Sequence, residues 1–182
     1  NWCGKNDTRH ISVKLNKNIE LHNFYIPAGG DEPDISKNPK FEHKISFLNE
    51  MKKYFQKNKK TNKILVGDLN VAPLEHDVWS HKQLLNVVSH TPIETDTLLD
   101  IIHTGEWQDV MREFVPHSEK LYSWWSYRNR NWELSNRGRR LDQCVALTLI
   151  VWHLSPLPSP PFDRSAESLN LFAYPTRLPT DR

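Results

Sequence analysis

The sequence has few cysteines and no long apolar run. Its 182 residues include only two cysteines, which cannot form a disulfide framework. No run of about eighteen apolar residues occurs, so we expect no membrane-spanning helix. The first five residues also lack the apolar segment of a secretory signal. A reducing, cytoplasmic setting is therefore the expected one.

The sequence also lacks a strong net charge. The formal value of +2 and the pI of about 8.5 are too mild to indicate nucleic-acid binding by themselves. The charge is uneven, however, because residues 128–140 hold five arginines and a single acid, Glu133. Three tryptophans, Trp124, Trp125 and Trp132, lie in or beside this stretch. Each arginine alone fits a solvated surface equally well, but the cluster with its aromatics favours contact with DNA.

The last part of the chain lacks lysine and glycine altogether. Residues 143–182 contain neither, yet they hold half of the twelve prolines. This composition is typical of a disordered segment, and we find no functional signal in it. We therefore expect one partial domain over residues 1–142, followed by a Pro-rich tail over residues 143–182.

What is present in the first part predicts an α/β arrangement. Residues 9–15 and 19–26 alternate apolar with polar side chains, as in a β-hairpin. Asn38 before Pro39 is a typical helix start, and the apolar spacing predicts an amphipathic helix to Lys57. A buried strand over residues 64–66 follows, which completes a strand–helix–strand pattern.

Helices and strands are also predicted further along. Thr91 and Glu94 form a capping-box pattern that predicts a helix through His103. The remaining predictions are a helix at 107–115, strands at 121–128 and from residue 139, and a polar loop at 129–138.

The end of the buried strand is the first candidate site. Gly67, Asp68 and Asn70 follow the apolar residues 64–66 directly. On extended backbone, residues two apart point to the same side, so Asp68 and Asn70 would present two hard oxygen ligands together. Such ligands at a strand end suit Mg²⁺ and hydrolytic chemistry. The same residues are common turn formers, and taken alone the turn is the more frequent outcome.

Several stretches together resemble the exodeoxyribonuclease III family of DNA-repair enzymes, within the endonuclease/exonuclease/phosphatase superfamily. The resemblance covers about residues 1–142, in the family's order and approximate spacing. The stretches that carry it are His22-Asn23-Phe24-Tyr25-Ile26-Pro27-Ala28-Gly29-Gly30-Asp31, Asn38-Pro39-Lys40-Phe41, Gly67-Asp68-Leu69-Asn70-Val71-Ala72-Pro73, Trp107-Gln108-Asp109, Tyr122-Ser123-Trp124-Trp125-Ser126-Tyr127-Arg128 and Ser135-Asn136-Arg137-Gly138-Arg139-Arg140-Leu141-Asp142.

The resemblance implies Mg²⁺-dependent hydrolysis of DNA phosphodiesters, with Mn²⁺ as a substitute. The substrates would be double-stranded DNA at abasic sites and at 3′ ends, bound by a monomer. Asp68 would orient the attacking water and contact the metal, and Asn70 would hold that water and share the metal. Tyr25 would direct its hydroxyl at the phosphate, although a rim aromatic is the alternative. Asp142 would orient a catalytic asparagine or water.

The resemblance also implies the residues that contact DNA. Trp124 would pack against the flipped-out abasic sugar, which offers no base to hydrogen-bond. Tyr127 alternates with it on the same strand. Arg128, Arg137 and Arg140 would contact phosphates, together with Arg130 and Arg139.

The implied fold is a four-layer α/β sandwich of two mixed β-sheets flanked by helices, incomplete in this chain. The family begins with a metal-binding asparagine and a metal-binding glutamate, which we expect to lie upstream of Asn1. It ends with an Asp-His pair that this sequence lacks, and the match breaks off at Gln143. One inserted nucleotide would convert His-Val-Trp codons into Gln-Cys-Val, so we expect residues 143–182 to be read out of frame. A chain without these parts should fold poorly and have little nuclease activity.

Two other functions stay open from the sequence. Gly67-Asp68-Leu69-Asn70 is shared across the superfamily, so a phosphodiesterase acting on a lipid or phosphoinositide is one alternative. The arginine-rich stretches favour DNA over that substrate. The second alternative is a catalytically inactive fragment that binds DNA without cleaving it.

Overall fold

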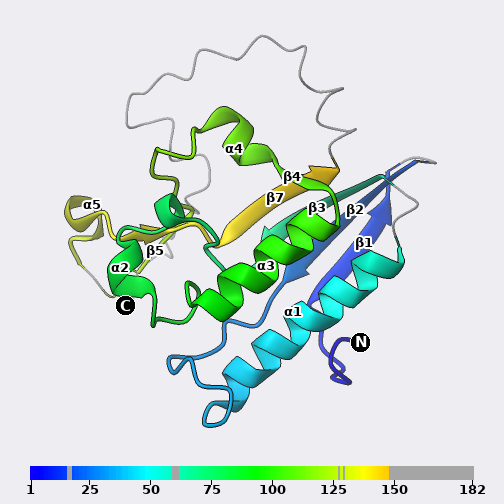
Figure 1. The fold of residues 1–182 in the computed structure, drawn as a ribbon, viewed down its shortest axis with the longest axis horizontal. Helices are drawn as coiled ribbons and strands as arrows, with labels where there is room; N and C mark the ends of the chain where they lie inside the picture. Colours follow the sequence, from blue (N-terminus) through cyan, green and yellow to red (C-terminus); the bar gives the residue numbers. More distant parts are fainter. Residues whose placement is uncertain (16–17, 59–61, 127, 129, 148–182) are drawn as a thin grey trace, which may run out of the picture.

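A five-stranded mixed sheet covered on one face by two long helices is the main feature of the fold (Figure 1). The computed structural model describes residues 1–15, 18–58, 62–126, 128 and 130–147. The sheet has the strand order β1-β2-β3-β7-β4. Its strands are β1 (His10–Lys14), β2 (Ile19–Tyr25), β3 (Asn62–Asp68), β4 (Trp107–Asp109) and β7 (Asp142–Leu147).

The strand pairing follows the order predicted from the sequence over its first part. Strands β1 and β2 form the expected antiparallel hairpin, with His10 opposite Phe24. Strand β3 pairs parallel to β2, and the chain crosses between them through helix α1 (Pro39–Lys57). Strand β7 then pairs antiparallel to β3 on one side and to β4 on the other. The sheet is therefore mixed, as the α/β fold class requires.

The two long helices start at the positions predicted from their capping residues. The Asn38 side chain accepts a hydrogen bond from the Lys40 amide at the start of α1, with Pro39 in the first turn. Helix α3 (Pro92–Thr104) begins with a capping box between Thr91 and Glu94. The helices lie side by side over the sheet (Figure 1). Neither these nor any other helix within the described ranges is long and apolar enough to cross a membrane.

The core lies between the helices and one face of the sheet. Phe24, Leu65 and Val145, from three adjacent strands, are each 1% exposed and pack in one cluster with Phe47 and Leu48 of α1. Burial of these side chains supplies the main stabilisation of the domain.

The opposite face of the sheet, called the open face below, is exposed at its β1 edge and covered around Ala146 of β7, which packs with Ile64 and Val110. Successive side chains of a strand point to opposite faces, so the residues that alternate with the core residues lie here. Ile11 and Val13 of β1 are 69% and 51% exposed. The open face therefore combines apolar side chains at its β1 edge with the candidate site residues described below.

A second, two-stranded sheet and several short helices complete the described fold. Strand β5 (Trp124–Trp125) pairs antiparallel with β6 (Gly138–Arg139). The short helices are η1 (Glu75–Asp77), α2 (His81–Leu84), α4 (Val110–Phe114) and α5 (Trp132–Ser135). A mixed sheet, a smaller second sheet and flanking helices confirm the predicted fold class, an incomplete α/β sandwich.

Three local predictions differ from the structure. Residues 107–115 are not one helix: Trp107–Asp109 pair with β7, and α4 begins only after Asp109, whose side chain caps it. The strand predicted over 121–128 is limited to Trp124–Trp125, and the loop predicted over 129–138 contains α5. In each case the local conformation depends on whether the segment pairs with a strand that is distant in the sequence.

The first residues of the predicted tail continue a strand that begins at Asp142. Strand β7 continues to Leu147 and lies between β3 and β4. Gln143 is 3% exposed and Val145 is 1% exposed. Residues 143–147 are thus part of the sheet, where Val145 packs in the helix-covered core and Ala146, which alternates with it, packs with Ile64 and Val110. The rest of the predicted tail, residues 148–182, lies outside the described residues.

Candidate active site

Three side chains lie in a row across adjacent strands at one end of the open face. Tyr25 of β2 is in register with Asp68 of β3, and Asp68 is in register with Asp142 of β7. Residues directly opposite one another in a sheet point to the same face, so the three side chains are neighbours. Tyr25 and Asp142 are exposed, and Asp68 is half-buried. Three residues that the sequence suggested separately are therefore brought together.

Asp68 has the most perturbed environment of the three. Its partial burial raises the pKa of the carboxyl from 3.8 to about 6, and the neighbouring charge of Asp142 acts in the same direction. The backbone N–H of Asn70 donates to Asp68 Oδ1 over 3.0 Å and opposes this rise. A carboxyl that titrates near neutral pH can both hold and release a proton under physiological conditions.

Asn70 does not extend the strand as predicted. Strand β3 ends at Asp68, and Asn70 has a φ of +53°, in the left-handed region that asparagine tolerates. The Asp68 carboxylate accepts the N–H two residues on, which is the geometry of an Asx turn. The two residues are thus neighbours because the chain turns, and the turn and the candidate site are the same feature.

The amide nitrogen of the Asn70 side chain is hydrogen-bonded within the protein. The residue is 8% exposed, and its Nδ2 donates to the backbone oxygen of Ile26 over 2.9 Å. This bond joins the loop after β3 to the end of β2, where Tyr25 lies. Only Oδ1 of Asn70 is left to serve as the predicted metal or water ligand.

The oxygen donors of this row fit Mg²⁺. Two carboxylates, Asp68 and Asp142, stand side by side, and a cation between them would relieve the repulsion that contributes to the raised pKa of Asp68. Mg²⁺ is commonly held by one or two carboxylates and keeps several waters. Within the described part of the chain, no group of three or more His, Cys, Asp or Glu residues is placed to hold a metal ion. The assignment of Asp68 and Asn70 as metal ligands stays a prediction.

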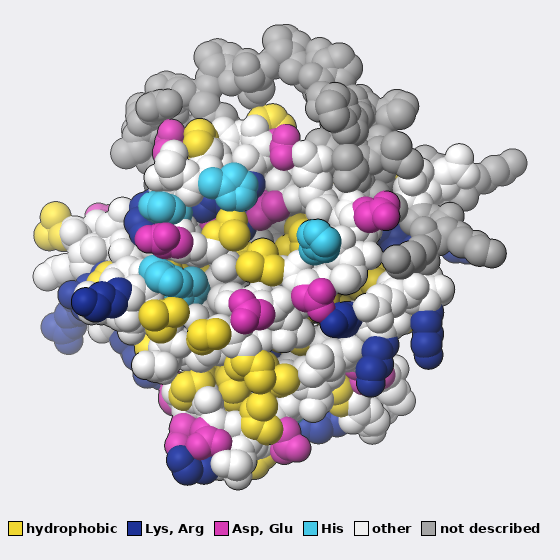
Figure 2. Space-filling model, viewed as in Figure 1, with side chains coloured by type: hydrophobic (Ala, Val, Ile, Leu, Met, Phe, Trp, Pro, Cys, Tyr) yellow, Lys and Arg dark blue, Asp and Glu magenta, His cyan; other side chains and the backbone are white. Residues whose placement is uncertain are grey.

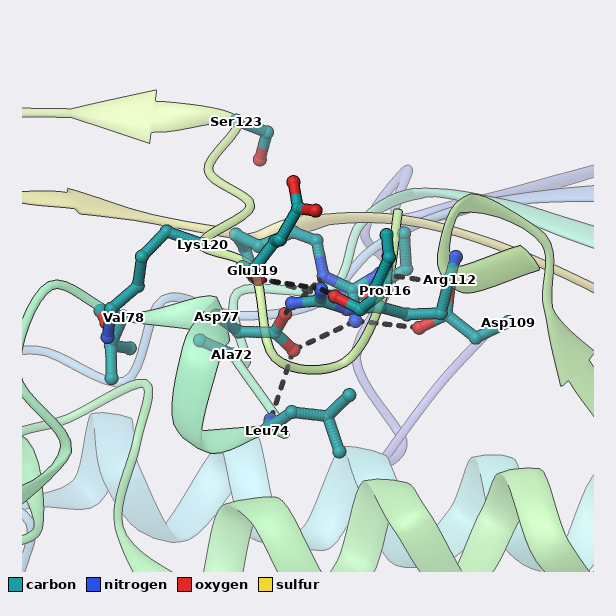
Figure 3. A network of polar contacts seen from close by, with 12 residues as sticks. Ala72, Leu74, Asp77, Val78, Asp109, Arg112, Pro116, Glu119, Lys120 and Ser123 are labelled. Atoms are coloured by element: carbon teal, nitrogen blue, oxygen red, sulfur yellow. Dashed lines mark hydrogen bonds and ion pairs between the residues drawn. The ribbon is translucent and has the colours of Figure 1, made fainter. Parts of the chain in front are cut away.

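Figure 3 shows a buried network of polar contacts around Asp77, Asp109 and Arg112. Arg140 belongs to the same network through ion pairs with Asp77 and Asp109. Asp77 is 0% exposed and accepts from Arg112 Nη2 at 2.5 Å and from Arg140 Nε at 2.9 Å. Arg140 Nη2 also bonds Asp77 Oδ2 at 2.8 Å, and its two terminal nitrogens reach Asp109 at 3.0 and 2.6 Å. Arg140 is 1% exposed. It therefore lies in the interior, and the predicted phosphate contact from Arg140 does not fit this arrangement.

The network instead holds the segment that leads into Asp142. The backbone N–H of Arg140 donates to the backbone oxygen of Asp77 over 2.7 Å. The hydroxyl oxygen of Ser123 accepts from the amides of Leu141 and Asp142, each at 3.0 Å. The position of Asp142 at the start of β7 is thus fixed from both sides.

A cavity of about 620 Å³ gathers most of the predicted DNA-binding residues. Trp124, Arg128 and Arg137 line it, and the loop after β2 closes one side with Gly30 and Asp31. Its wall also includes Trp79, Trp125, Trp132 and Arg139. Tyr127 lies outside the described residues.

Arginines and tryptophans are paired in this cavity wall. The guanidinium of Arg137 lies 4.6 Å from the ring centre of Trp79, and that of Arg139 lies 5.9 Å from Trp124. Trp79 was not identified from the sequence, because it lies well before the arginine-rich stretch and only the fold brings it there. Flat rings beside positive charges can stack on nucleobases or sugars while they attract phosphates.

The helix-covered face has a different character. Figure 2 shows acidic and basic side chains scattered over this face, with most of the histidines gathered at its upper left and apolar side chains exposed in its lower part. A DNA backbone would meet mixed charge there, whereas the cavity wall combines arginines with tryptophans.

Sequence reasoning missed two buried residues that hold the site. Lys44 lies in the apolar stripe of α1, three residues after Phe41 and four before Leu48, and that position alone signals burial. Asp77 shows no such signal, because its partners Arg112 and Arg140 are distant in the chain.

The fold is that of known DNA-processing enzymes. An AP endonuclease from Archaeoglobus fulgidus has a TM-score of 0.67 and 27% identity, over 76% of this chain and 52% of that one. The 3′ phosphatase NExo from Neisseria, solved with a product DNA hairpin, has a TM-score of 0.72 and 17% identity, over 82% and 56%. The AP endonuclease LMAP from Leishmania major has a TM-score of 0.65 and 21% identity, over 80% and 47%.

The match to the AP endonuclease, at 27% identity, agrees with the resemblance to the exodeoxyribonuclease III family. The matches below 25% identity carry the fold alone. This chain spans about half the length of the structures that it matches. No protein-family description and no curated protein matches the sequence.

Proposed function

We propose that the row of Tyr25, Asp68 and Asp142 serves in the Mg²⁺-dependent hydrolysis of DNA phosphodiester bonds. The single observation that carries the proposal is the register of these residues on three adjacent strands. The likeness to nucleases and phosphatases that act on DNA supports it. The proposed site of action is cytoplasmic, and the proposed form is a monomer.

The side chains of the row have distinct chemical tasks in this proposal. Asp68, with a pKa of about 6, is mostly ionised at neutral pH and can accept a proton from the attacking water. The exposed Tyr25 can donate its hydroxyl proton in a hydrogen bond to a phosphate oxygen. Asp68, Asp142 and Oδ1 of Asn70 would hold Mg²⁺, which supplies positive charge for the oxygens of the phosphate when bound.

The proposed substrate is double-stranded DNA with an abasic site or a 3′ end. Arg128 and Arg137 would contact phosphates, and Trp124 would pack against a bare sugar. A missing base removes all base-edge hydrogen bonds, so shape and apolar contact are what a protein can recognise there. The aromatic and basic wall of the cavity suits both tasks.

The test is a cleavage assay on labelled duplexes that carry one abasic analogue or a recessed 3′ end. Because the glutamate and histidine implied by the resemblance are missing, we expect weak cleavage. It should require Mg²⁺ or Mn²⁺, stop with EDTA and fall at least about 100-fold in Asp68→Asn, the usual scale for loss of a catalytic group. A soluble inositol phosphate is the control substrate and should not be hydrolysed. Equal cleavage by wild type and Asp68→Asn would overturn the assignment of the row.

A second candidate function is DNA binding without cleavage. It is favoured by the small donor set, since the described residues offer two carboxylates and no group of three metal-ligating side chains. The glutamate and the histidine implied by the resemblance also have no counterpart in the matched stretches. Duplex binding in a gel-shift assay without any Mg²⁺-dependent product would support this function over the first.

A further inference from the structure

A lysine lies fully buried directly beneath the candidate site. Lys44 of α1 is 0% exposed, although lysines are almost never buried completely. Its Nζ donates to the backbone oxygen of Asn70 over 2.8 Å and to that of Ala28 over 3.3 Å. It also forms an ion pair with Glu94 of α3.

These contacts join the two loops that carry the site. Ala28 belongs to the loop after β2, just beyond Tyr25, and Asn70 belongs to the turn after Asp68. The chain leaves room for this lysine at Gly29, where an added Cβ would stand 2.9 Å from Lys44 Cδ. One ammonium group thus fixes the separation of the two loops.

The partner carboxylate is itself held rigidly. Both oxygens of Glu94 accept from the Ser89 amide at 2.9 Å, and Oε2 also accepts from the amide and hydroxyl of Thr91. Glu94 therefore keeps most of its hydrogen bonds if the lysine is removed. The backbone carbonyls of Asn70 and Ala28 would lose the hydrogen bond from Lys44, which is the donor that reaches both of them from the helix layer.

Packing of α1 against α3 does not explain why Lys44 is buried beside Glu94. Lys52 of α1 already forms an ion pair with Asp100 of α3, and both are partly exposed. A buried ion pair that served packing alone could be replaced by apolar side chains at little cost or with a gain in stability. An apolar side chain could not donate to the two carbonyls.

We propose that Lys44 is a positioning residue that holds the Asp68–Asn70 turn in its productive geometry through the backbone oxygen of Asn70. This inference rests on the proposed function of the row for its kinetic consequence. Without the lysine, the Asn70 carbonyl would be left unsatisfied and the left-handed turn would move. A shift of about 1 Å in a catalytic group can lower a rate about 100-fold.

The variants separate positioning from stability. Lys44→Met removes the donor and leaves Glu94 as a buried unpaired charge, so the melting temperature should fall. The double variant Lys44→Met/Glu94→Gln removes both charges and should recover most of that loss. Lys52→Met is the matched control, because it breaks the other lysine–acid pair between the same two helices.

The first readout is amide hydrogen exchange, which needs neither DNA nor metal. In the double variant we expect residues 69–72 to exchange at least about tenfold faster than in the wild type, as expected for a turn that opens locally. The exchange of residues 62–67 and of α1 should stay unchanged, and Lys52→Met should match the wild type throughout. Wild-type exchange at 69–72 in a stable double variant would overturn the proposal.

The second readout is single-turnover cleavage together with DNA affinity. In the double variant we expect the rate to fall about 10- to 100-fold while the Kd for duplex DNA stays within twofold, because Lys44 is not on the DNA side. A merely structural role predicts that the rate recovers along with the melting temperature. If the wild type itself does not cleave, the proposed function fails, and the exchange experiment still decides the role of Lys44.

Discussion

At the scale of single residues, the site contains groups in surroundings that are unfavourable for their charge or backbone conformation. Asp68 is a half-buried carboxyl beside a second carboxyl, with a pKa raised to about 6. Asn70 has left-handed backbone, and Lys44 is a wholly buried lysine. Such groups cost stability, and proteins keep them where function requires them.

Neutralising Asp68 should therefore stabilise the fold. The raised pKa means that the folded state binds the Asp68 proton more tightly than the unfolded chain does. The stability of the wild type consequently falls as the pH rises from about 4 to about 6, and the full cost is present above that window. With EDTA present, we expect Asp68→Asn to raise the free energy of unfolding at pH 8 by about 1 kcal/mol, a value discounted for partial exposure.

The control for this prediction is the same measurement at low pH. At pH 4.5 the Asp68 carboxyl is mostly protonated in the folded state but still mostly ionised in the unfolded chain, so the gain from Asp68→Asn should fall to roughly a third of its value at pH 8. Urea denaturation at both pH values checks it. An equal gain at both, or a loss at pH 8, would contradict the raised pKa of Asp68.

Two arginines of the same segment should respond in opposite ways. Arg140→Met removes four hydrogen bonds to Asp77 and Asp109 from the interior, and we expect a loss of about 3 kcal/mol in the free energy of unfolding. Arg137→Met is its control, because Arg137 is exposed and lies over Trp79. It should leave stability within about 0.5 kcal/mol.

DNA binding distinguishes the same two variants. Arg137→Met should weaken duplex binding and lower the slope of log K against log salt by about 1. Arg140→Met should keep the wild-type slope at a temperature where it remains folded. Thermal melts measure the stability of both variants, and fluorescence anisotropy at several salt concentrations measures their DNA binding. A change of the salt slope in Arg140→Met would show that Arg140 contacts DNA phosphates.

At the scale of elements, the close approach of β2 and β3 at Gly67 brings the site together. Gly67 has a φ of +127°, and an added Cβ would stand 2.1 Å from the backbone oxygen of Phe24. Since Phe24 and Gly67 directly precede Tyr25 and Asp68, this contact sets the register of the row. Only glycine allows both the conformation and the approach.

Gly67→Ala should accordingly be severe. We expect a loss of about 4 kcal/mol in the free energy of unfolding, or failure to fold, because the strands must separate to admit the methyl group. Gly4→Ala is the control, with a φ of +66° but no atom within 4 Å of the added Cβ. It should cost only about 1 kcal/mol, the price of the left-handed conformation. If chemical denaturation gave equal losses of unfolding free energy for Gly67→Ala and Gly4→Ala, the close approach of β2 and β3 would not contribute to stability.

Strand β7 is the element that the sequence described least well. Its composition suggested a boundary after Asp142, yet the strand lies between two others and buries Val145. Val145→Ala should cost about 2 kcal/mol because the methyl groups it loses leave a cavity in the core. Leu15→Ala, at a 56% exposed position, should cost less than about 0.5 kcal/mol. A negligible effect of Val145→Ala on the urea midpoint would contradict the placement of Val145 in the core.

At the scale of the whole molecule, local patterns predicted what local physics determines. The hairpin, both long helices with their caps, and the buried strand followed from periodicity and capping residues. The resemblance supplied the members of the row, Tyr25, Asp68 and Asp142. Their alignment depends on strand pairing between distant segments, which periodicity cannot show.

The failures share the same cause. Arg140 has the composition of a surface contact, and only the arrival of Asp77 and Asp109 from elsewhere in the chain buries it. The bond from Asn70 to the backbone oxygen of Ile26 likewise supports the left-handed turn, which also depends on the local bond to Asp68 and was the alternative that the sequence left open. Long-range contacts thus decided each position where the sequence prediction was wrong.

The most direct test of the central claim is the location of a bound Mn²⁺ ion by anomalous diffraction from crystals grown with an abasic duplex. The row predicts an anomalous peak within about 2.5 Å of an Asp68 carboxylate oxygen, with a DNA phosphate within hydrogen-bond reach of the Tyr25 hydroxyl. A metal peak and a phosphate that both lie away from Tyr25, Asp68 and Asp142 would contradict it.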